Sequence, residues 1–244
     1  MNTAAFFDID GTLYRDSLLI EHFKKLLKYE ILDEALWHTN VKYIYEDWTK
    51  RRGNYDDYIG ELARIYTDSL KGLDKTKMDF ITNQVIDLKG DKVYMYTRRQ
   101  INWHKKMKHC LFFVSGSPDY LVHKMAERYK LTDSVGSKYH LDENDKYTGE
   151  VDQMWDSESK ENAVLKFAEK YDVDLSESYA YGDTSGDLSM FRLVGNPVAI
   201  NPTRELLYQL KEEDELKHKI RVVVERKDVI YFLDPDVDIC CPEL

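Results

Sequence analysis

The chain has 244 residues, 43% of them hydrophobic and 33% charged, and this length allows one large core or one core with a small attached domain. Its formal net charge of −10 at pH 7 argues against general nucleic-acid binding, and no apolar run approaches the roughly 18 residues that span a bilayer. The three cysteines lack the spacing of zinc sites or disulfide frameworks, so a cytoplasmic protein is expected.

A short apolar strand around Phe6 and Phe7 leads directly into two carboxylates, Asp8 and Asp10. Residues at i and i+2 of a strand share a face, so both carboxylates can converge on one reacting centre, and Gly11 allows a sharp turn there. Such a pair suits a two-step displacement in which one carboxylate attacks phosphorus and the other carries protons. Alternatively, the two acids bind a structural ion, cap the next helix or lie in solvent.

From residue 14 to about 90 the pattern is helical. A first apolar face begins at Leu18, and further helices are predicted over 33–50, 55–71 and 75–88. This stretch is rich in aromatic residues, for which packing between helices is favoured over lining an apolar or cation-binding pocket. These residues are Tyr43, Tyr45, Trp48, Tyr55, Tyr58 and Tyr66.

The apolar run 111–114 predicts a buried parallel strand that ends at the rim of a sheet. Ser115 and the backbone N–H groups that follow it can donate hydrogen bonds to phosphate oxygens, at the N-terminus of a helix that begins near Asp119. The plainer interpretation is that Ser117 caps this helix, and we expect that cap as well.

Two later segments complete the candidate site. Lys160 begins an amphipathic helix, where a lone lysine is usually a solvated charge. A strand at 179–182 is followed by Asp183 and Asp187, whose carboxylates point one way if the chain bends there into a helix. With the first two acids they would offer oxygen ligands to a hard cation, and a site shared with phosphate favours Mg²⁺. The alternative is a surface turn.

Beyond residue 212 the segments 220–224 and 229–233 indicate two strands around a charged turn. They could form a hairpin on the edge of a sheet.

Taken in order, these segments resemble the four motifs of the haloacid dehalogenase superfamily, on its phosphoserine-phosphatase-like branch, subfamily IB. The resemblance covers roughly residues 3–13 and 111–210. It implies an α/β fold, a doubly wound parallel sheet with a Rossmann-like core and an inserted helical cap. Residues 1–13 and 91–244 would form the catalytic core, and residues 14–90 the helical cap, which folds over the catalytic cleft.

The resemblance also implies the chemical roles. Asp8 would be the nucleophile that forms an aspartyl-phosphate, and Asp10 the general acid for the leaving group and the base for the hydrolytic water. Mg²⁺ would be bound by Asp8, by the main-chain carbonyl of Asp10 and by Asp183, with Asp187 reaching the ion directly or through water.

Further residues would hold the substrate. The resemblance assigns the phosphoryl group to four of them: Thr12, Ser115, Gly116 and Lys160. The chain departs from phosphoserine phosphatases where these carry a glutamate for the substrate amine, because that position is Ser17, with Asp16 and Glu21 as the nearest acids. Arg64 lies near the place of the family's cap arginine. The candidates for recognising the leaving group are therefore Asp16, Ser17, Glu21 and Arg64.

The function implied is a Mg²⁺-dependent phosphomonoesterase that hydrolyses a small phosphorylated metabolite, with no nucleic acid or membrane as partner. The departure at Ser17 makes phosphoserine a weak substrate candidate. Two alternatives stay open. One is phosphoryl transfer to an acceptor other than water, as in mutases, and the other is a non-catalytic module that binds a phosphorylated ligand. The oligomeric state is not determined by the sequence.

Overall fold

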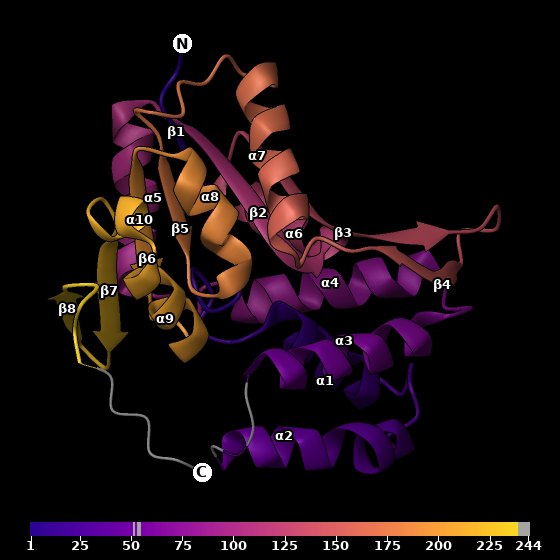
Figure 1. Cartoon of the computed structure of the whole chain (residues 1–244). Coiled ribbons are helices and arrows are strands. Elements are labelled where there is room, and N and C mark those ends of the chain that lie inside the picture. Colours follow the sequence, from indigo (N-terminus) through magenta and orange to yellow (C-terminus); the bar gives the residue numbers. More distant parts are fainter. Residues whose placement is uncertain (51, 53–54, 239–244) are drawn as a thin grey trace.

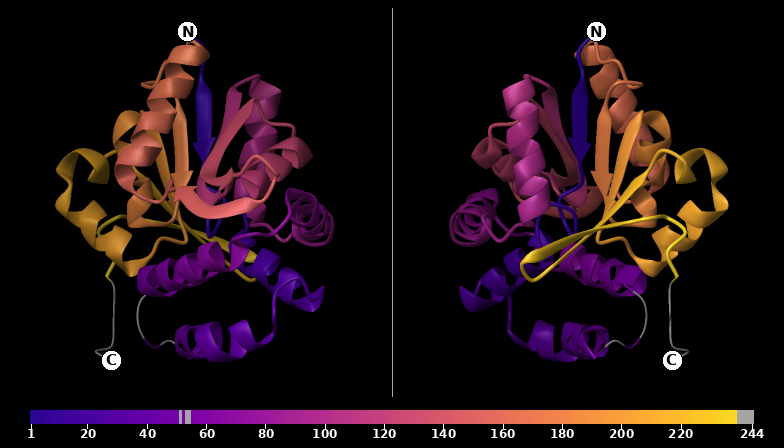
Figure 2. Two further views of the ribbon diagram at one scale, coloured as in Figure 1. Left: turned by 90° about the vertical axis from the view of Figure 1, so that its right-hand side faces the viewer. Right: turned by 90° about the vertical axis from the view of Figure 1, so that its left-hand side faces the viewer.

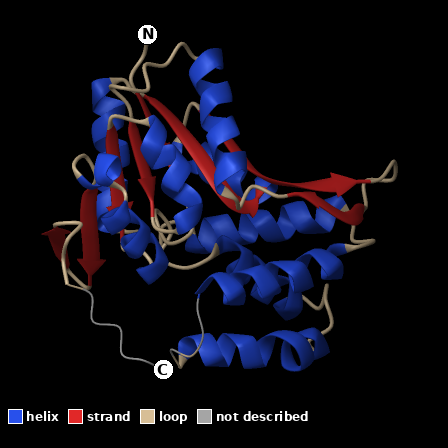
Figure 3. Ribbon diagram, in the orientation of Figure 1, coloured by secondary structure: helices blue, strands red, loops and turns tan. Residues whose placement is uncertain are grey.

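The computed structural model describes residues 1–50, 52 and 55–238, and its centre is one sheet in the order β4-β3-β2-β1-β5-β6-β7-β8 (Figures 1 and 3). The strands are β1 (Ala4–Phe7), β2 (Cys110–Pro118), β3 (Asp133–Leu141), β4 (Tyr147–Asp152), β5 (Tyr179–Gly182), β6 (Asn196–Ile200), β7 (Arg221–Arg226) and β8 (Val229–Leu233).

The inner strands are parallel, and the strands at both edges are antiparallel to their neighbours. The chain winds from β1 through β2 to β3 on one side, and then from β5 through β6 to β7 on the other. This order reverses between β1 and β5, the place where open sheets of this kind bind ligands. The predicted doubly wound α/β fold is confirmed, and so is the edge hairpin, which β7 and β8 form.

Helices surround the sheet and continue beyond one end of it (Figures 1 and 2). The single helix predicted over 33–50 is instead a π-helical turn followed by α2. The helices are α1 (Leu18–Lys28), the π-helical turn η1 (Trp37–Val41), α2 (Lys42–Thr49), α3 (Tyr55–Leu70), α4 (Lys75–Lys89), α5 (Met95–Met107), α6 (Asp119–Tyr129), α7 (Ser157–Lys170), the 3₁₀ turn η2 (Ser185–Asp187), α8 (Leu188–Leu193), α9 (Arg204–Glu212) and α10 (Asp214–Lys217).

Alternation along β1 separates two apolar layers. Ala4 and Phe6 pack with buried residues of α7, α8 and α9, whereas Ala5 and Phe7 pack with those of α5 and α6. Phe6 stacks on Phe112 of β2, with the ring centroids 5.2 Å apart. A central strand buried on both faces explains why its sequence is continuously apolar.

The helices α1, α2 and α3 lie beyond the carboxyl ends of the parallel strands (Figures 1 and 2). A buried chain of hydrogen bonds connects this layer to α6. Thr82 of α4 contacts His22 of α1 at 3.3 Å, His22 contacts the Tyr66 hydroxyl of α3 at 2.9 Å, and that hydroxyl contacts Tyr120 of α6 at 2.5 Å. Within the described residues, no helix is both long and apolar enough to cross a bilayer.

The buried position of His22 predicts acid sensitivity. Burial lowers the pKa of His22 to about 3, so the folded chain binds fewer protons here than the unfolded chain, whose histidines titrate near 6.5. Stability must therefore fall as the pH drops from about 6.5 towards 3, by up to about 1.4 kcal/mol per pH unit for this group. We expect His22→Gln to flatten this slope, measured by urea unfolding at pH 7, 6 and 5.

The exposed His38 provides the matched control, and His38→Gln should keep the wild-type slope. Equal slopes in the wild type and in His22→Gln would contradict the expectation.

Candidate active site

Asp8 is the first residue after β1, and its backbone N–H still donates to the carbonyl of Tyr181 in β5, at 2.9 Å. The alternation of β1 places Asp8 on the face of Phe6, towards α7, and only 5% of Asp8 is exposed. The chain then turns at Gly11, whose φ of +78° suits glycine. A Cβ at Gly11 would lie 2.0 Å from Asp183 Oδ2, so no side chain fits here.

Three donors hold the carboxylate of Asp10. Ser117 Oγ donates at 2.6 Å, Ser17 Oγ donates at 3.3 Å, and the backbone N–H of Leu18 donates at 2.9 Å. The expected capping of α6 by Ser117 is wrong, because its hydroxyl is directed to Asp10 and makes no cap bond. Burial raises the pKa of Asp10 to about 6, although the three hydrogen bonds lower it.

Lys160 is buried in the first turns of α7, with 4% exposure, so the alternative of a solvated charge is wrong. Asp156 caps this helix by accepting a hydrogen bond from the Ser159 amide, which fixes where the helix begins. The Lys160 ammonium lies 2.5 Å from Asp187 Oδ1 and 3.2 Å from Asp8 Oδ1. Burial alone would lower the pKa of Lys160, but these two carboxylates outweigh it and raise the pKa above its ordinary value.

Asp183 follows β5 directly, and Asp187 closes the 3₁₀ turn η2. Asp187 Oδ2 accepts the backbone amides of Asp183 at 2.9 Å and Thr184 at 3.0 Å, which holds the turn around the site. Thr12 is predicted to contact phosphate. In the structure its hydroxyl donates a hydrogen bond to Asp183 Oδ1 at 2.8 Å and so orients that carboxylate. Burial is the main cause that raises the pKa of Asp183 well above its usual range.

The carboxylates of Asp8, Asp183 and Asp187 offer oxygen atoms that lie within 4.8 Å of one another. Burial, together with the nearby acids Asp187 and Asp10, raises the pKa of Asp8 to about 7 although Lys160 lowers it. One ammonium cannot balance three buried carboxylates, so a bound cation would relieve their mutual repulsion. Oxygen donors of this kind fit a hard cation such as Mg²⁺.

Ser115 and Gly116 lie at the end of β2, as predicted. Ser115 is 1% exposed, and its Oγ accepts the backbone N–H of Ser117 at 3.3 Å. Among the described residues it donates to no partner, so its proton is available to a ligand.

The four predicted specificity residues do not all come together. Ser17 is buried and contacts Asp10. Asp16 and Glu21 share Lys92, whose ammonium lies 3.0 Å from Asp16 and 3.9 Å from Glu21. Arg64 forms ion pairs on its own helix with Glu61 and Asp68, and 60% of its side chain is exposed.

Two residues near this site are not singled out by the sequence pattern. Trp155 donates its indole N–H to the Gly116 carbonyl at 2.7 Å. Tyr55, at the start of α3, has a pKa raised well above its ordinary value by burial and then by the charges of Asp183 and Asp10. Tyr55 is one of the six aromatic residues for which the sequence favours packing between helices, and no local pattern distinguishes it from the other five.

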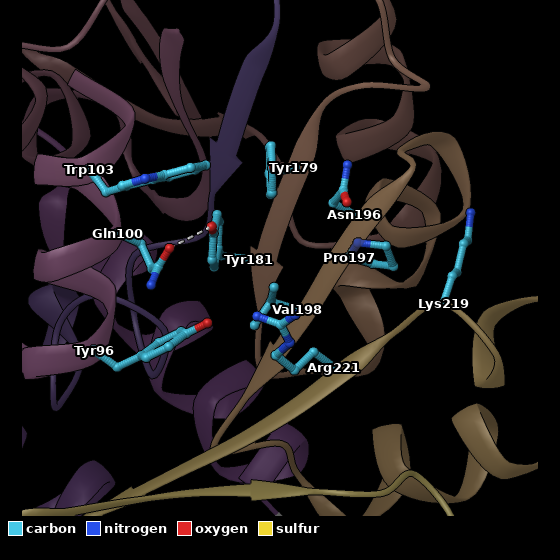
Figure 4. Close-up of a pocket in the computed structure, with 10 residues that line it drawn as sticks. All are labelled: Tyr96, Gln100, Trp103, Tyr179, Tyr181, Asn196, Pro197, Val198, Lys219 and Arg221. Atoms are coloured by element: carbon cyan, nitrogen blue, oxygen red, sulfur yellow. Dashed lines mark hydrogen bonds between the residues drawn. The ribbon is translucent and has the colours of Figure 1, made fainter. Parts of the chain in front are cut away.

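A separate pocket of about 420 Å³ lies over the open sheet face beside α5 (Figure 4). Tyr96, Gln100 and Trp103 of α5 approach it from one side, and Lys219 and Arg221 lie at the other. None of the predicted site residues lines this pocket. The acidic cluster therefore defines the candidate active site.

A family model described as haloacid dehalogenase-like hydrolase matches residues 5–192. A probable phosphatase of Mycobacterium tuberculosis is 27% identical over 207 residues, covering 84% of this chain and 70% of the relative. The histidinol-phosphatase of Neisseria meningitidis is 22% identical over 220 residues, covering 87% and 96%. A solved phospho-aspartyl intermediate analogue of phosphoserine phosphatase is similar with a TM-score of 0.60 and 21% identity, covering 93% and 95%. This last likeness supports the fold.

The contact at Gly11 predicts a large effect of a single methyl group. Gly11→Ala forces a positive φ on alanine and drives its Cβ into the Asp183 carboxylate, so we expect a loss of about 2 kcal/mol or more in unfolding free energy. Gly60, in α3, has no atom within 4 Å of an added Cβ, and Gly60→Ala should add about 0.5–1 kcal/mol. Urea denaturation checks both, and equal effects would contradict the assigned contact.

Proposed function

Because this chain belongs to the haloacid dehalogenase-like hydrolase family, we propose that it hydrolyses a small phosphorylated metabolite with Asp8 as the nucleophile. The chain is an enzyme of the phosphatase type. One observation carries the proposal, the buried arrangement of Asp8, Lys160, Asp183 and Asp187 at the carboxyl ends of β1 and β5. This arrangement places a nucleophilic carboxylate beside an ammonium and a candidate cation site, which would stabilise the negative charge of a phosphoryl group.

In the first step, a carboxylate oxygen of Asp8 attacks phosphorus and the bond from phosphorus to the leaving alcohol oxygen breaks. Asp10 gives its proton to that oxygen. In the second step, Asp10 takes a proton from water, the water oxygen attacks phosphorus, and the bond to Asp8 breaks to release phosphate. The pKa of Asp10, raised to about 6 by burial, suits a group that both gives and takes protons near neutral pH.

The residues around the phosphoryl group would act by position and charge. The Lys160 ammonium, held 3.2 Å from Asp8, would oppose the negative charge on the phosphoryl oxygens. The free proton of Ser115 and the amide of Gly116 would donate hydrogen bonds to those oxygens. Thr12 would act indirectly, by holding Asp183.

Asp8, Asp183 and the Asp10 main-chain carbonyl would hold Mg²⁺, with Asp187 reaching it directly or through water. When bound, the cation supplies charge stabilisation to the phosphoryl oxygens. Lys160 bridges the carboxylates of Asp8 and Asp187, and the backbone amides of Asp183 and Thr184, just before the η2 turn, orient Asp187.

Residues 14–90 would form a helical cap over a core made of residues 1–13 and 91–244, and would select the leaving group. Ser17 is engaged with Asp10 and carries no charge for a substrate amine. Arg64 is paired with acids of its own helix, so its guanidinium is not free to anchor a substrate carboxylate. Both observations favour a metabolite other than phosphoserine.

The assigned nucleophile gives the sharpest test. Asp8→Asn should lower phosphate release from any accepted phosphomonoester by about a thousandfold or more, because the amide cannot form the phosphoenzyme. The assay measures released phosphate with Mg²⁺ across a panel of phosphorylated metabolites. Asp91→Asn is the matched control, since Asp91 is exposed and forms its ion pair with Arg128, away from the acidic cluster. Retained turnover in Asp8→Asn would refute the assigned role.

Metal binding has a readout that does not require turnover. Saturating Mg²⁺, at about one hundred times its Kd, should raise the wild-type Tm by roughly 5–10 °C. Asp183→Asn should lose most of this shift, because it removes a ligand. Without metal, Asp183→Asn should unfold at a higher temperature than the wild type, because one buried like charge is gone.

Differential scanning calorimetry measures both effects. An equal Mg²⁺ shift in the wild type and in Asp183→Asn would argue against this metal site.

A further inference from the structure

The carbonyl oxygen of Gly116 accepts two hydrogen bonds from outside the family motifs. Ser137 Oγ, from β3, donates at 2.7 Å, and the Trp155 indole N–H donates at 2.7 Å. The hydroxyl of Ser137 is itself fixed, because it accepts the backbone N–H of Met154 at 3.1 Å. Both lone-pair directions of this carbonyl are thus occupied, so the peptide group that joins residues 116 and 117 has one orientation.

That orientation decides where the neighbouring groups point. In a trans peptide the N–H is directed opposite to the carbonyl, so fixing the Gly116 carbonyl also fixes the Ser117 N–H, which donates to Ser115 Oγ. Ser115 then keeps its own proton for a ligand. The Ser117 side chain donates to Asp10 Oδ2 at 2.6 Å. The orientation of this one peptide group therefore positions both Ser115, the proposed phosphate donor, and Asp10, the proposed proton carrier.

Trp155 also joins segments that are far apart in the sequence. A Cβ at Gly116 would lie 2.5 Å from Trp155 Cδ1, and a Cβ at Gly186 would lie 2.7 Å from the Trp155 carbonyl oxygen. The side chain thus packs on the end of β2, and the main chain packs on the η2 turn that follows β5. The next residue, Asp156, caps the helix that carries Lys160. Trp155 contacts or adjoins three of the four segments that build the site.

We propose that Trp155 and Ser137 are positioning residues that orient the Gly116 peptide and so aim Ser115 at the phosphoryl group. The inference rests on the proposed function for its kinetic consequence, but its geometric part concerns phosphate binding alone. Errors of about 1 Å in the placement of a catalytic group can lower rates by about a hundredfold, so losing one of two hydrogen bonds should have a smaller but measurable effect.

The test uses Trp155→Phe, which keeps an aromatic ring but loses the N–H, and Ser137→Ala, which leaves the indole in place. Trp103→Phe is the matched control, because this indole lies beside the separate pocket of Figure 4. Calorimetric titration with inorganic phosphate in saturating Mg²⁺ gives the affinity, and p-nitrophenyl phosphate gives kcat and KM. Tm values report folding.

We expect each of the two variants to weaken phosphate binding and to lower kcat by about tenfold, with Tm close to the wild type. The double variant should lower kcat further, towards a hundredfold, because neither side chain then holds the Gly116 carbonyl. A purely structural role would reduce the fraction of active protein without changing the Kd for phosphate. Should Trp155→Phe fail to fold, Ser137→Ala alone carries the decision.

Wild-type phosphate affinity and kcat in Ser137→Ala, or in folded Trp155→Phe, would overturn the inference, as would an effect of Trp103→Phe of the same size. A wild-type protein that binds phosphate but hydrolyses no phosphomonoester would refute the proposed function only. In that case, tenfold weaker phosphate binding in the variants would still support the positioning role.

Discussion

A lysine buried between two buried carboxylates is the interaction on which the site depends. Moving Lys160 out of water is unfavourable unless its charge is paired at short range, and the structure meets this condition with Asp187 and Asp8. The pairing fixes α7 against the carboxyl ends of β1 and β5, because the ammonium must reach acids from both strands' loops. It also leaves carboxylates in excess of cations, which makes the cluster a place for a divalent ion.

The strand ends were predictable because they depend on local pattern. A continuous apolar run that stops at Asp8, Ser115 or Asp183 indicates a buried parallel strand and its functional end. The order of the sheet then brings these ends together at the reversal between β1 and β5. Most of the predicted site residues that gather there are placed by the ends of the strands or by α7, and Ser17, at the start of α1, joins them through Asp10.

The remaining contacts depend on which of several possible hydrogen-bond or ion-pair partners each side chain selects, and a sequence does not show this choice. Ser117 has the position and chemistry of a helix cap, yet the buried Asp10 carboxylate is the stronger acceptor and receives the hydrogen bond of its hydroxyl. Trp155 has no periodic apolar neighbours to mark it, and its importance comes from a carbonyl that lies 39 positions earlier. Arg64 has the expected residue type and neighbourhood, but acids one turn away along its helix bind it.

The place of β1 in the sheet has a consequence for how the chain is made. Phe6 pairs with Phe112 on one side and Ala180 on the other, so β1 has no partner close to it in the sequence. The chain segments between these paired strands are long. Bringing their ends together costs conformational entropy before the strand gains any hydrogen bond. During synthesis the apolar β1 segment stays unpaired while the helices from α1 to α5 emerge. The nucleophile at its end reaches its lysine only when α7 has been made, so an incomplete chain cannot assemble this centre.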